Sequence, residues 1–185
     1  FVDATLRHAE RLSNLVSDLL DISKIESGRY EQEAGWIDLT SAVTSIVDDM
    51  KPLASERGVV LTADDLAPVD VLVDVKALDQ VLTNLIQNAV KYAHEKGVRV
   101  WVRTAVRKKD VKICVLDEGP GIPKIHHNRI FERFYRVDAG RSKHMGGTGL
   151  GLSIVKHLVG SMGGSVGLHL NEPVGTVFWF TVPRF

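Results

Sequence analysis

The chain has 185 residues, 44% of them hydrophobic, and its 23 basic and 23 acidic residues cancel. That length suits one substantial domain with a small appendage, and the balanced charge gives no reason to expect binding to nucleic acid or to a membrane surface. No apolar run approaches the ~20 residues that a membrane helix needs. The single cysteine, Cys114, excludes a disulfide framework. Its strand-like surroundings predict a packed, inert thiol and favour a reducing, cytoplasmic setting.

The first 28 residues predict one helix. Apolar residues at Leu12, Leu15, Leu19 and Ile22 follow a 3-4-3 spacing, which forms a seam suited to packing against other helices. A helix folded onto its own domain is the alternative. Because the chain starts in mid-pattern, we expect further segments upstream of it.

Beyond this helix, helices and strands alternate loosely. After a linker and a short strand near Trp36, a helix capped by Thr40 or Ser41 is expected to run to about Arg57, with a kink or break at Pro52. The order predicts an α/β sandwich with helices on one face of a mixed sheet. The other expected elements are strands at 59–61 and 69–73, a helix at 75–94 capped by Asp74, strands at 98–106 and 111–116, a short helix at 128–135, a helix from about 150, and strands at 164–170 and 175–182.

The most informative stretch is the glycine run Gly146–Leu152, which leads directly into an apolar helical pattern. Its four glycines allow positive φ and close backbone approach to a ligand, and a following helix N-terminus favours a phosphate. A flexible turn before a helix is the alternative. The chain has no Gly-Lys pair and so no P-loop, and the spacing differs from the dinucleotide-binding G-x-G-x-x-G.

Three further motifs precede the glycine run, namely Asn84–Tyr92, Asp117–Ile122 and Phe131–Arg136. In this order, the four resemble the N box, first glycine box, F box and second glycine box of sensor histidine kinases. Arg11–Gly28 is similar to the second helix of their dimerisation domain. The resemblance implies the Bergerat (GHKL) ATP-binding fold, shared with heat-shock chaperone ATPases, MutL and type II topoisomerases. It also implies three segments: part of the dimerisation domain, its second helix, at residues 1–28, a linker at 29–35 and the ATP-binding catalytic domain at 36–185.

The first motif lies on the helix at 75–94. Asn84, Asn88 and Lys91 are spaced i, i+4, i+7 and share one face, opposite Val75 and the leucines. A solvated polar face is the alternative, although two mid-helix asparagines cost a few tenths of a kcal/mol each, roughly, relative to Glu or Lys. The resemblance implies that Asn88 gives its carbonyl oxygen to Mg²⁺ and that Asn84 supports it. It also implies that Lys91 reaches phosphate and that Tyr92 packs beside the nucleotide.

The second motif places Asp117 at a strand end, before a turn with two glycines, Gly119 and Gly121. A carboxylate there can accept a hydrogen bond from an exocyclic amine, although a turn of no consequence is the alternative. The resemblance implies that Asp117 accepts from the adenine N6 and selects ATP over GTP. The remaining nucleotide contacts that it implies are Gly119, Gly121, Ile122, Gly147, Thr148, Gly149, Leu150, Gly151, Leu152 and Thr176.

In the third motif, the spacing of Phe131 and Phe134 predicts core packing. The resemblance implies that Arg136 points towards the γ-phosphate and is catalytic together with Asn84 and Lys91. The polar stretch 137–147 predicts a lid over the nucleotide. We expect His126, His127 and His144 to be surface histidines rather than metal ligands, because no cysteine or carboxylate falls at ligand spacing around them.

The resemblance implies donation of the ATP γ-phosphate to a histidine, followed by relay to the receiver domain of a response regulator. The implied partners also include the protein's own dimerisation domain in a homodimer, with upstream segments anchoring the parent protein in the inner membrane. The family's Ser-His-Glu-Leu-Arg-Thr-Pro-like acceptor motif occurs nowhere here, and His8 lacks the adjacent acid. This chain is therefore not expected to autophosphorylate. Residues 131–158 are most similar to the phosphate-sensing PhoR type.

Two other functions remain open. An ATP-hydrolysing clamp such as MutL shares the implied fold but normally has a glutamate where Asn84 stands, and Asn cannot accept a proton from water. A non-catalytic scaffold descended from a kinase would normally show broken glycine boxes, whereas those of this chain are intact.

Overall fold

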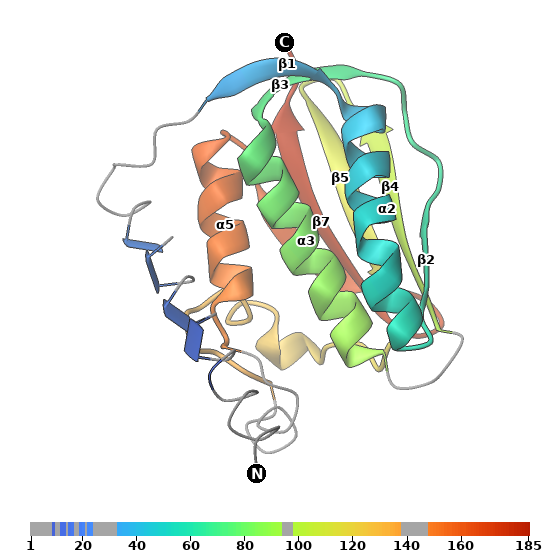
Figure 1. Ribbon diagram of the computed structural model, residues 1–185, viewed down its shortest axis with the longest axis vertical. Helices are drawn as coiled ribbons and strands as arrows, with labels where there is room; N and C mark the ends of the chain where they lie inside the picture. Colours follow the sequence, from blue (N-terminus) through green and yellow to red (C-terminus); the bar gives the residue numbers. More distant parts are fainter. Residues whose placement is uncertain are drawn as a thin grey trace.

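The computed structural model describes residues 33–93, 98–137 and 148–185, together with nine positions between Ala9 and Ser23. A layer of helices covers one face of a five-stranded sheet (Figure 1). The elements in chain order are β1 (Ala34–Asp38), α2 (Leu39–Glu56), β2 (Val60–Ala63), β3 (Asp70–Asp74), α3 (Val75–Tyr92), β4 (Arg99–Val106), β5 (Asp110–Asp117), the 3-10 helix η1 (Lys124–His126), α5 (Gly151–Ser161), β6 (Val166–Leu170) and β7 (Thr176–Pro183).

The sheet is mixed, which confirms the predicted fold class. Its strand order is β2-β4-β5-β7-β6; β2 runs parallel to β4, and every other neighbouring pair is antiparallel. The sequence did not predict that β1 and β3 leave this sheet and form a separate antiparallel pair, with Trp36 opposite Leu72.

Three local predictions need correction. The N-cap of α2 is Asp38 rather than Thr40 or Ser41, because its carboxylate accepts a hydrogen bond from the Thr40 backbone N–H at 2.9 Å. Pro52 does not break α2, which continues through it to Glu56. The short helix expected at 128–135 is instead η1 followed by hydrogen-bonded turns.

The core lies between the helical layer and the sheet. Leu78, Leu82, Leu85 and Ile86 of α3 are fully buried there, each contributing about 1.5–3 kcal/mol. Val75, the first residue of α3, was expected on the same face but is 47% exposed and lines a groove between α2 and α3. The strand residues that face this layer alternate with residues on the opposite, open face of the sheet. They are Val100, Val102, Ile113, Val115, Phe178 and Phe180.

The open face of the sheet carries a second, smaller apolar cluster, formed by Trp101, Leu116 and Val177, with Cys114 packed against it. Arg99 and Arg103 place their guanidinium groups 5.3 and 5.7 Å from the Trp101 ring, which is only 9% exposed. The predicted packing of Cys114 is confirmed, and burial raises the pKa of its thiol, which agrees with the predicted low reactivity. Long basic side chains thus shield this face from water.

The described positions between Ala9 and Ser23 are all helical, as predicted. Ile22 is buried in the main core and Leu15 packs against it, whereas Leu12 and Leu19 are 64% and 48% exposed. Two members of the predicted seam therefore contact this domain, and the other two are exposed. The two contacts agree with the alternative in which the helix folds onto its own domain. None of the described helices is long and apolar enough to cross a membrane.

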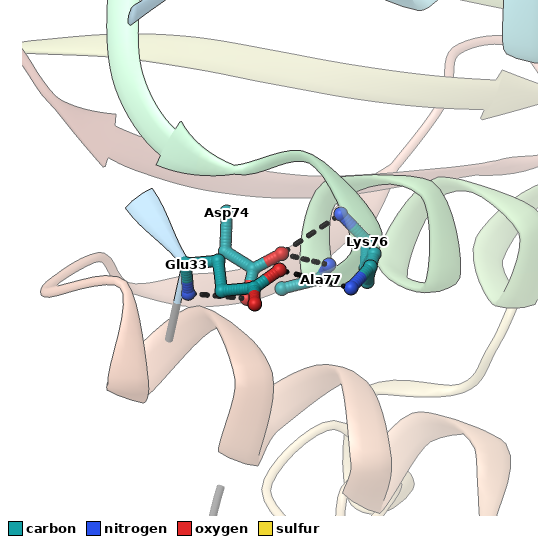
Figure 2. Close-up of polar contacts among 4 residues, drawn as sticks. All are labelled: Glu33, Asp74, Lys76 and Ala77. Carbon is teal, nitrogen blue, oxygen red and sulfur yellow. Dashed lines mark hydrogen bonds and ion pairs between the residues drawn. The ribbon is translucent and has the colours of Figure 1, made fainter. Parts of the chain in front are cut away.

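The N-terminus of α3 is held by one buried carboxylate, that of Asp74 (Figure 2). Its Oδ1 accepts from the backbone N–H groups of Lys76 at 2.8 Å and Ala77 at 3.2 Å, which confirms the predicted cap. Its Oδ2 accepts from the backbone N–H of Glu33 at 3.3 Å. The same carboxylate thus fixes both the start of α3 and the segment that enters β1.

Replacing Asp74 with alanine is expected to lower the free energy of unfolding by about 1–2 kcal/mol, because it removes the cap and leaves three backbone donors without an acceptor. Urea unfolding measures the loss. The matched control is Asp38→Ala, which removes the exposed cap of α2 and should cost less. Equal losses in the two variants would contradict the dual role of Asp74.

Candidate functional site

Three polar side chains of α3 make up the first predicted motif, and one of them, Asn84, approaches α5. Asn84, Asn88 and Lys91 are each half-buried, so they form neither a fully solvated face nor one directly opposite the core. The Asn84 side-chain amide donates to the Gln80 carbonyl at 2.9 Å. Its Oδ1 lies so close to Gly151, the first residue of α5, that a Cβ there would be 2.8 Å away. A glycine at this position lets the α5 N-terminus approach the carboxamide.

Asp117 ends β5 on the helical side of the sheet and is 7% exposed. Its Oδ1 accepts two backbone hydrogen bonds, from Gly119 at 2.8 Å and from Thr176 at 3.1 Å. Among the described residues, no hydrogen bond reaches its Oδ2. Burial raises the pKa of Asp117, and the two N–H donors oppose this shift. The site thus holds a rigid carboxylate with one oxygen available to a ligand.

The hairpin between β6 and β7 also contacts Asp117. The Asn171 side-chain amide donates to the Asp117 backbone carbonyl at 3.0 Å, and the Asn171 N–H donates to the Gly175 carbonyl at 3.0 Å. Gly175 has a φ of +116°, and a Cβ there would lie 1.8 Å from the Asp117 carbonyl oxygen. The sequence did not single out Asn171, because only the pairing of Asp117 with Thr176 brings the hairpin to this position.

The end of α3 meets the glycine turn that follows Asp117. A Cβ on Gly119 would lie 3.4 Å from the Tyr92 carbonyl oxygen, and a Cβ on Gly121 would lie 3.2 Å from the Gly175 carbonyl oxygen. The Lys91 Nζ lies 5.2 Å from the centroid of the Tyr92 ring. The structure therefore brings Tyr92, Asp117, Gly119 and Gly121 together, as the sequence predicted.

The core prediction for the F-box phenylalanines holds for one of them. Phe131 is half-buried and packs edge-on against Phe178, with ring centroids 6.4 Å apart. Phe134 is 59% exposed, so its prediction is wrong. Its φ of +60° and the hydrogen bond from its N–H to the Gly149 carbonyl at 2.9 Å fix the backbone of this residue against the glycine run.

Two adjacent histidines connect the segment after η1 to the rest of the site. His126 Nδ1 lies 2.7 Å from the Tyr135 hydroxyl, and His127 Nε2 lies 2.7 Å from the Ile122 carbonyl oxygen. Both side chains are half-buried rather than free on the surface. They tie the F box to the first glycine turn, a structural role that their spacing did not indicate.

The N-terminus of α5 has no side-chain cap. Its N-cap residue is Leu150, whose N–H donates to the Thr148 hydroxyl at 3.2 Å, while Gly149 has a φ of +78°. The Phe134–Gly149 hydrogen bond brings the segment before Arg136 to this end of α5. The Arg136 Nη2 is buried, with no hydrogen-bond partner among the described residues. Helix N–H groups and a guanidinium nitrogen without an acceptor are suited to a phosphate.

The other predicted site residues divide into those inside and those outside the described residues. Leu150 is fully buried, and Leu152 is half-buried. Gly147, most of the predicted lid (138–147) and His144 lie outside the described residues. A surface groove of about 590 Å³ lies between α2 and α3, but Asp49, Lys76, Asp79 and its other lining residues include none of the predicted site.

The chain has clear relatives. Residues 73–185 match the family described as histidine kinase-, DNA gyrase B- and HSP90-like ATPase. The chain is 36% identical over 184 residues to the sensor histidine kinase WalK of Bacillus subtilis, and 32% identical over 185 residues to the sensor-like histidine kinase SenX3 of Mycolicibacterium smegmatis. These alignments cover 99% and 100% of this chain but only 30% and 48% of the two relatives.

Among solved structures, full-length ShkA in complex with AMPPNP superimposes with a TM-score of 0.81 and 32% sequence identity, over 97% of this chain and 37% of that one. The mixed sheet with helices on one face is the Bergerat ATP-binding fold that the motifs implied. The chain therefore belongs to the histidine kinase-, DNA gyrase B- and HSP90-like ATPase family, as the ATP-binding catalytic domain of a sensor histidine kinase.

Proposed function

We propose that this domain binds ATP with Mg²⁺ and donates the γ-phosphate to a histidine on a helical dimerisation domain. The observation that carries the proposal is the approach of the Asn84 carboxamide to Gly151, at the uncapped N-terminus of α5. The contact supports the proposal because a carboxamide on the helix that carries Asn88 lies beside backbone donors suited to phosphate.

In this proposal the adenine lies against Asp117, whose Oδ2 accepts from the N6 amine. Tyr92, Gly119, Gly121 and Ile122 flank the base, because the end of α3 and the glycine turn converge there. The phosphates lie over the residues from Gly147 to Leu152, where the chain enters α5. Lys91 and Arg136 neutralise phosphate charge, and the buried Nη2 of Arg136 gains the acceptor that the described residues do not provide.

The donor set fits Mg²⁺, an ion that takes few protein oxygens and keeps phosphates and waters as its other ligands. Asn88 would hold the ion through its carbonyl oxygen. Asn84 would support the shell, because its amide nitrogen already donates to Gln80 and its Oδ1 lies towards α5. When bound, the ion would offset the charge on the phosphates. Asn84 has no basic group with which to activate water, which disfavours steady hydrolysis.

The partners follow from the same reaction. The phosphate passes first to the histidine of a dimerisation domain in a homodimer and then to the receiver domain of a response regulator. Relatives named as sensor histidine kinases support the first of these steps, phosphate transfer to a histidine. The PhoR-like subgroup, the domain limits at residues 28 and 35, and a membrane-anchored parent protein stay predictions.

The proposal is tested by incubating the chain with γ-labelled ATP and a separate dimerisation domain that carries the acceptor motif. We expect acid-labile, base-stable label on the added domain and none on this chain. Asn88→Ala should lower the rate by about 100-fold through loss of the metal ligand. The matched control is Gln87→Ala, an exposed neighbour on α3. Label on this chain that His8→Gln abolishes, or equal rates in both variants, would contradict the proposal.

A further inference from the structure

We propose that Asn171 is a positioning residue for base selection: its side-chain amide holds the β6–β7 hairpin on Asp117, so that one carboxylate oxygen faces the base in a fixed direction. The inference rests on the proposed adenine role of Asp117 and extends it to a residue of a distant hairpin.

The hairpin contacts Asp117 at two atoms. The Asn171 amide donates to its backbone carbonyl at 3.0 Å, and the Thr176 N–H donates to its Oδ1 at 3.1 Å. Asn171 also closes the hairpin, because its own N–H donates to the Gly175 carbonyl at 3.0 Å. Loss of the Asn171 amide therefore removes one of the two hydrogen bonds from the hairpin to Asp117 and loosens the connection next to the Thr176 donor, which β7 still pairs with Asp117.

The close packing at Gly175 leaves little space between the β6–β7 hairpin and Asp117. The hypothetical Cβ at this residue would lie 1.8 Å from the Asp117 carbonyl oxygen, while the Gly175 carbonyl oxygen would lie 3.2 Å from a Cβ on Gly121. The hairpin thus packs closely against both Asp117 and the glycine turn that follows Asp117. A shift of the hairpin changes the direction of the carboxylate and the position of this turn together.

The orientation of Asp117 decides selectivity, because both N–H donors are used on Oδ1. The other oxygen is then left to accept from an amine such as the N6 of adenine, whereas the O6 of guanine offers a second acceptor and is rejected. A carboxylate free to rotate loses this distinction, since a preorganised acceptor contributes more than a mobile one.

The pKa of Asp117 depends on the same contacts between the β6–β7 hairpin and its carboxylate. Its raised pKa comes from burial, opposed by the Gly119 and Thr176 N–H groups. The titratable groups on neighbouring positions are Glu118, whose carboxylate accepts from the Arg99 N–H, and Lys91 and Tyr92 at the end of α3. Weakening the Thr176 donor removes one of the two groups that stabilise the carboxylate, so its pKa should rise further.

The experiment is calorimetric binding of ATP, ADP and GTP to the wild type and Asn171→Ala between pH 5 and 8. We expect ATP and ADP to bind roughly 5- to 20-fold more weakly to the variant, by equal factors because the hairpin is proposed to act on the base. The ATP-to-GTP preference should fall, and the pH below which ADP binding weakens should move upward. Val174→Ala, at the exposed tip of the same hairpin, should change none of these.

A second variant, Asn171→Asp, keeps the shape of the side chain but cannot donate to the Asp117 carbonyl, and it should give the same changes with a larger pH shift. Thermal unfolding without nucleotide distinguishes a purely structural role of Asn171 from the proposed positioning role. If either variant lowers the melting temperature while selectivity and pH profile stay those of the wild type, the inference is overturned. A wild type that binds GTP as tightly as ATP would instead refute the proposed function of Asp117.

Discussion

Asp117→Asn is expected to weaken ATP binding by about 10- to 100-fold while making the nucleotide-free domain more stable at neutral pH. In the variant, the carbonyl oxygen of the amide can still accept from Gly119 and Thr176. Its nitrogen then faces the base, where it meets the N6 donor of adenine with another donor. Calorimetry with ATP and GTP measures the loss, which should be accompanied by a reduced preference for ATP.

The stability change follows from the sign of the pKa shift. Burial raises the pKa of Asp117 in the folded state, so folding favours the protonated carboxyl. Stability from this group is therefore highest below the unfolded pKa and is lost as the pH rises through the folded pKa. Val174→Ala, at the exposed tip of the β6–β7 hairpin, keeps Asp117 and its two N–H donors and serves as the control. Urea unfolding of the wild type and Asp117→Asn at pH 4 and pH 7 should show a gain for the variant only at the higher pH. A gain of equal size at both values would contradict this account.

Gly149→Val is expected to abolish detectable nucleotide binding while leaving the sheet folded. Gly149 has a φ of +78°, which a β-branched residue adopts only under strain, and a Cβ there would lie 3.0 Å from the Phe134 Cα. The backbone must shift to relieve that contact, which displaces the Gly149 carbonyl from the Phe134 N–H and the loop from the N-terminus of α5.

Calorimetry with ADP and ATP measures the loss, and circular dichroism checks the fold. The matched control is Gly160→Val in α5, the helix that follows Gly149, where an added Cβ meets no atom within 4 Å. That variant should bind nucleotide like the wild type and should be no less stable, since glycine is the poorer helix former. Binding by Gly149→Val within a few-fold of the control would remove this loop from the proposed site.

Much of the architecture followed from local sequence signals. The 3.6-residue periodicity placed α3, and the Asp74 cap and the mixed sheet with helices on one face were predicted correctly. The failures have identifiable causes. Asp38 lies two residues before Thr40, and all these residue types favour an N-cap, so only the observed hydrogen bond decides among them. Pro52 lies on an exposed side of α2, where the helix tolerates it.

The site was predictable as a set of motifs but not as a set of contacts. Phe134 has the spacing of a core residue, yet its positive φ and the hydrogen bond to Gly149 arise from two segments separated by the predicted lid. His126 and Asn171 carry no local pattern that marks them, because each acts on a partner that only the fold brings near. The contacts of these residues depend on long-range pairing of segments, which sequence periodicity does not encode.

The placement of the tryptophans has a practical consequence for spectroscopy. Trp101 and Trp179 lie on the open face of the sheet, where the guanidinium groups of two arginines lie over the Trp101 ring and the Lys112 ammonium lies over the Trp179 ring. Trp36 lies on β1 against Phe185. The sheet therefore stands between the first two indoles and the helical side, where Asp117 and α3 lie. Intrinsic emission of this domain will report its unfolding and the state of its outer surface, and it will be largely silent when a nucleotide binds. An optical titration needs a reporter on the other side of the sheet, and Tyr92, at the end of α3, offers a position for an introduced indole.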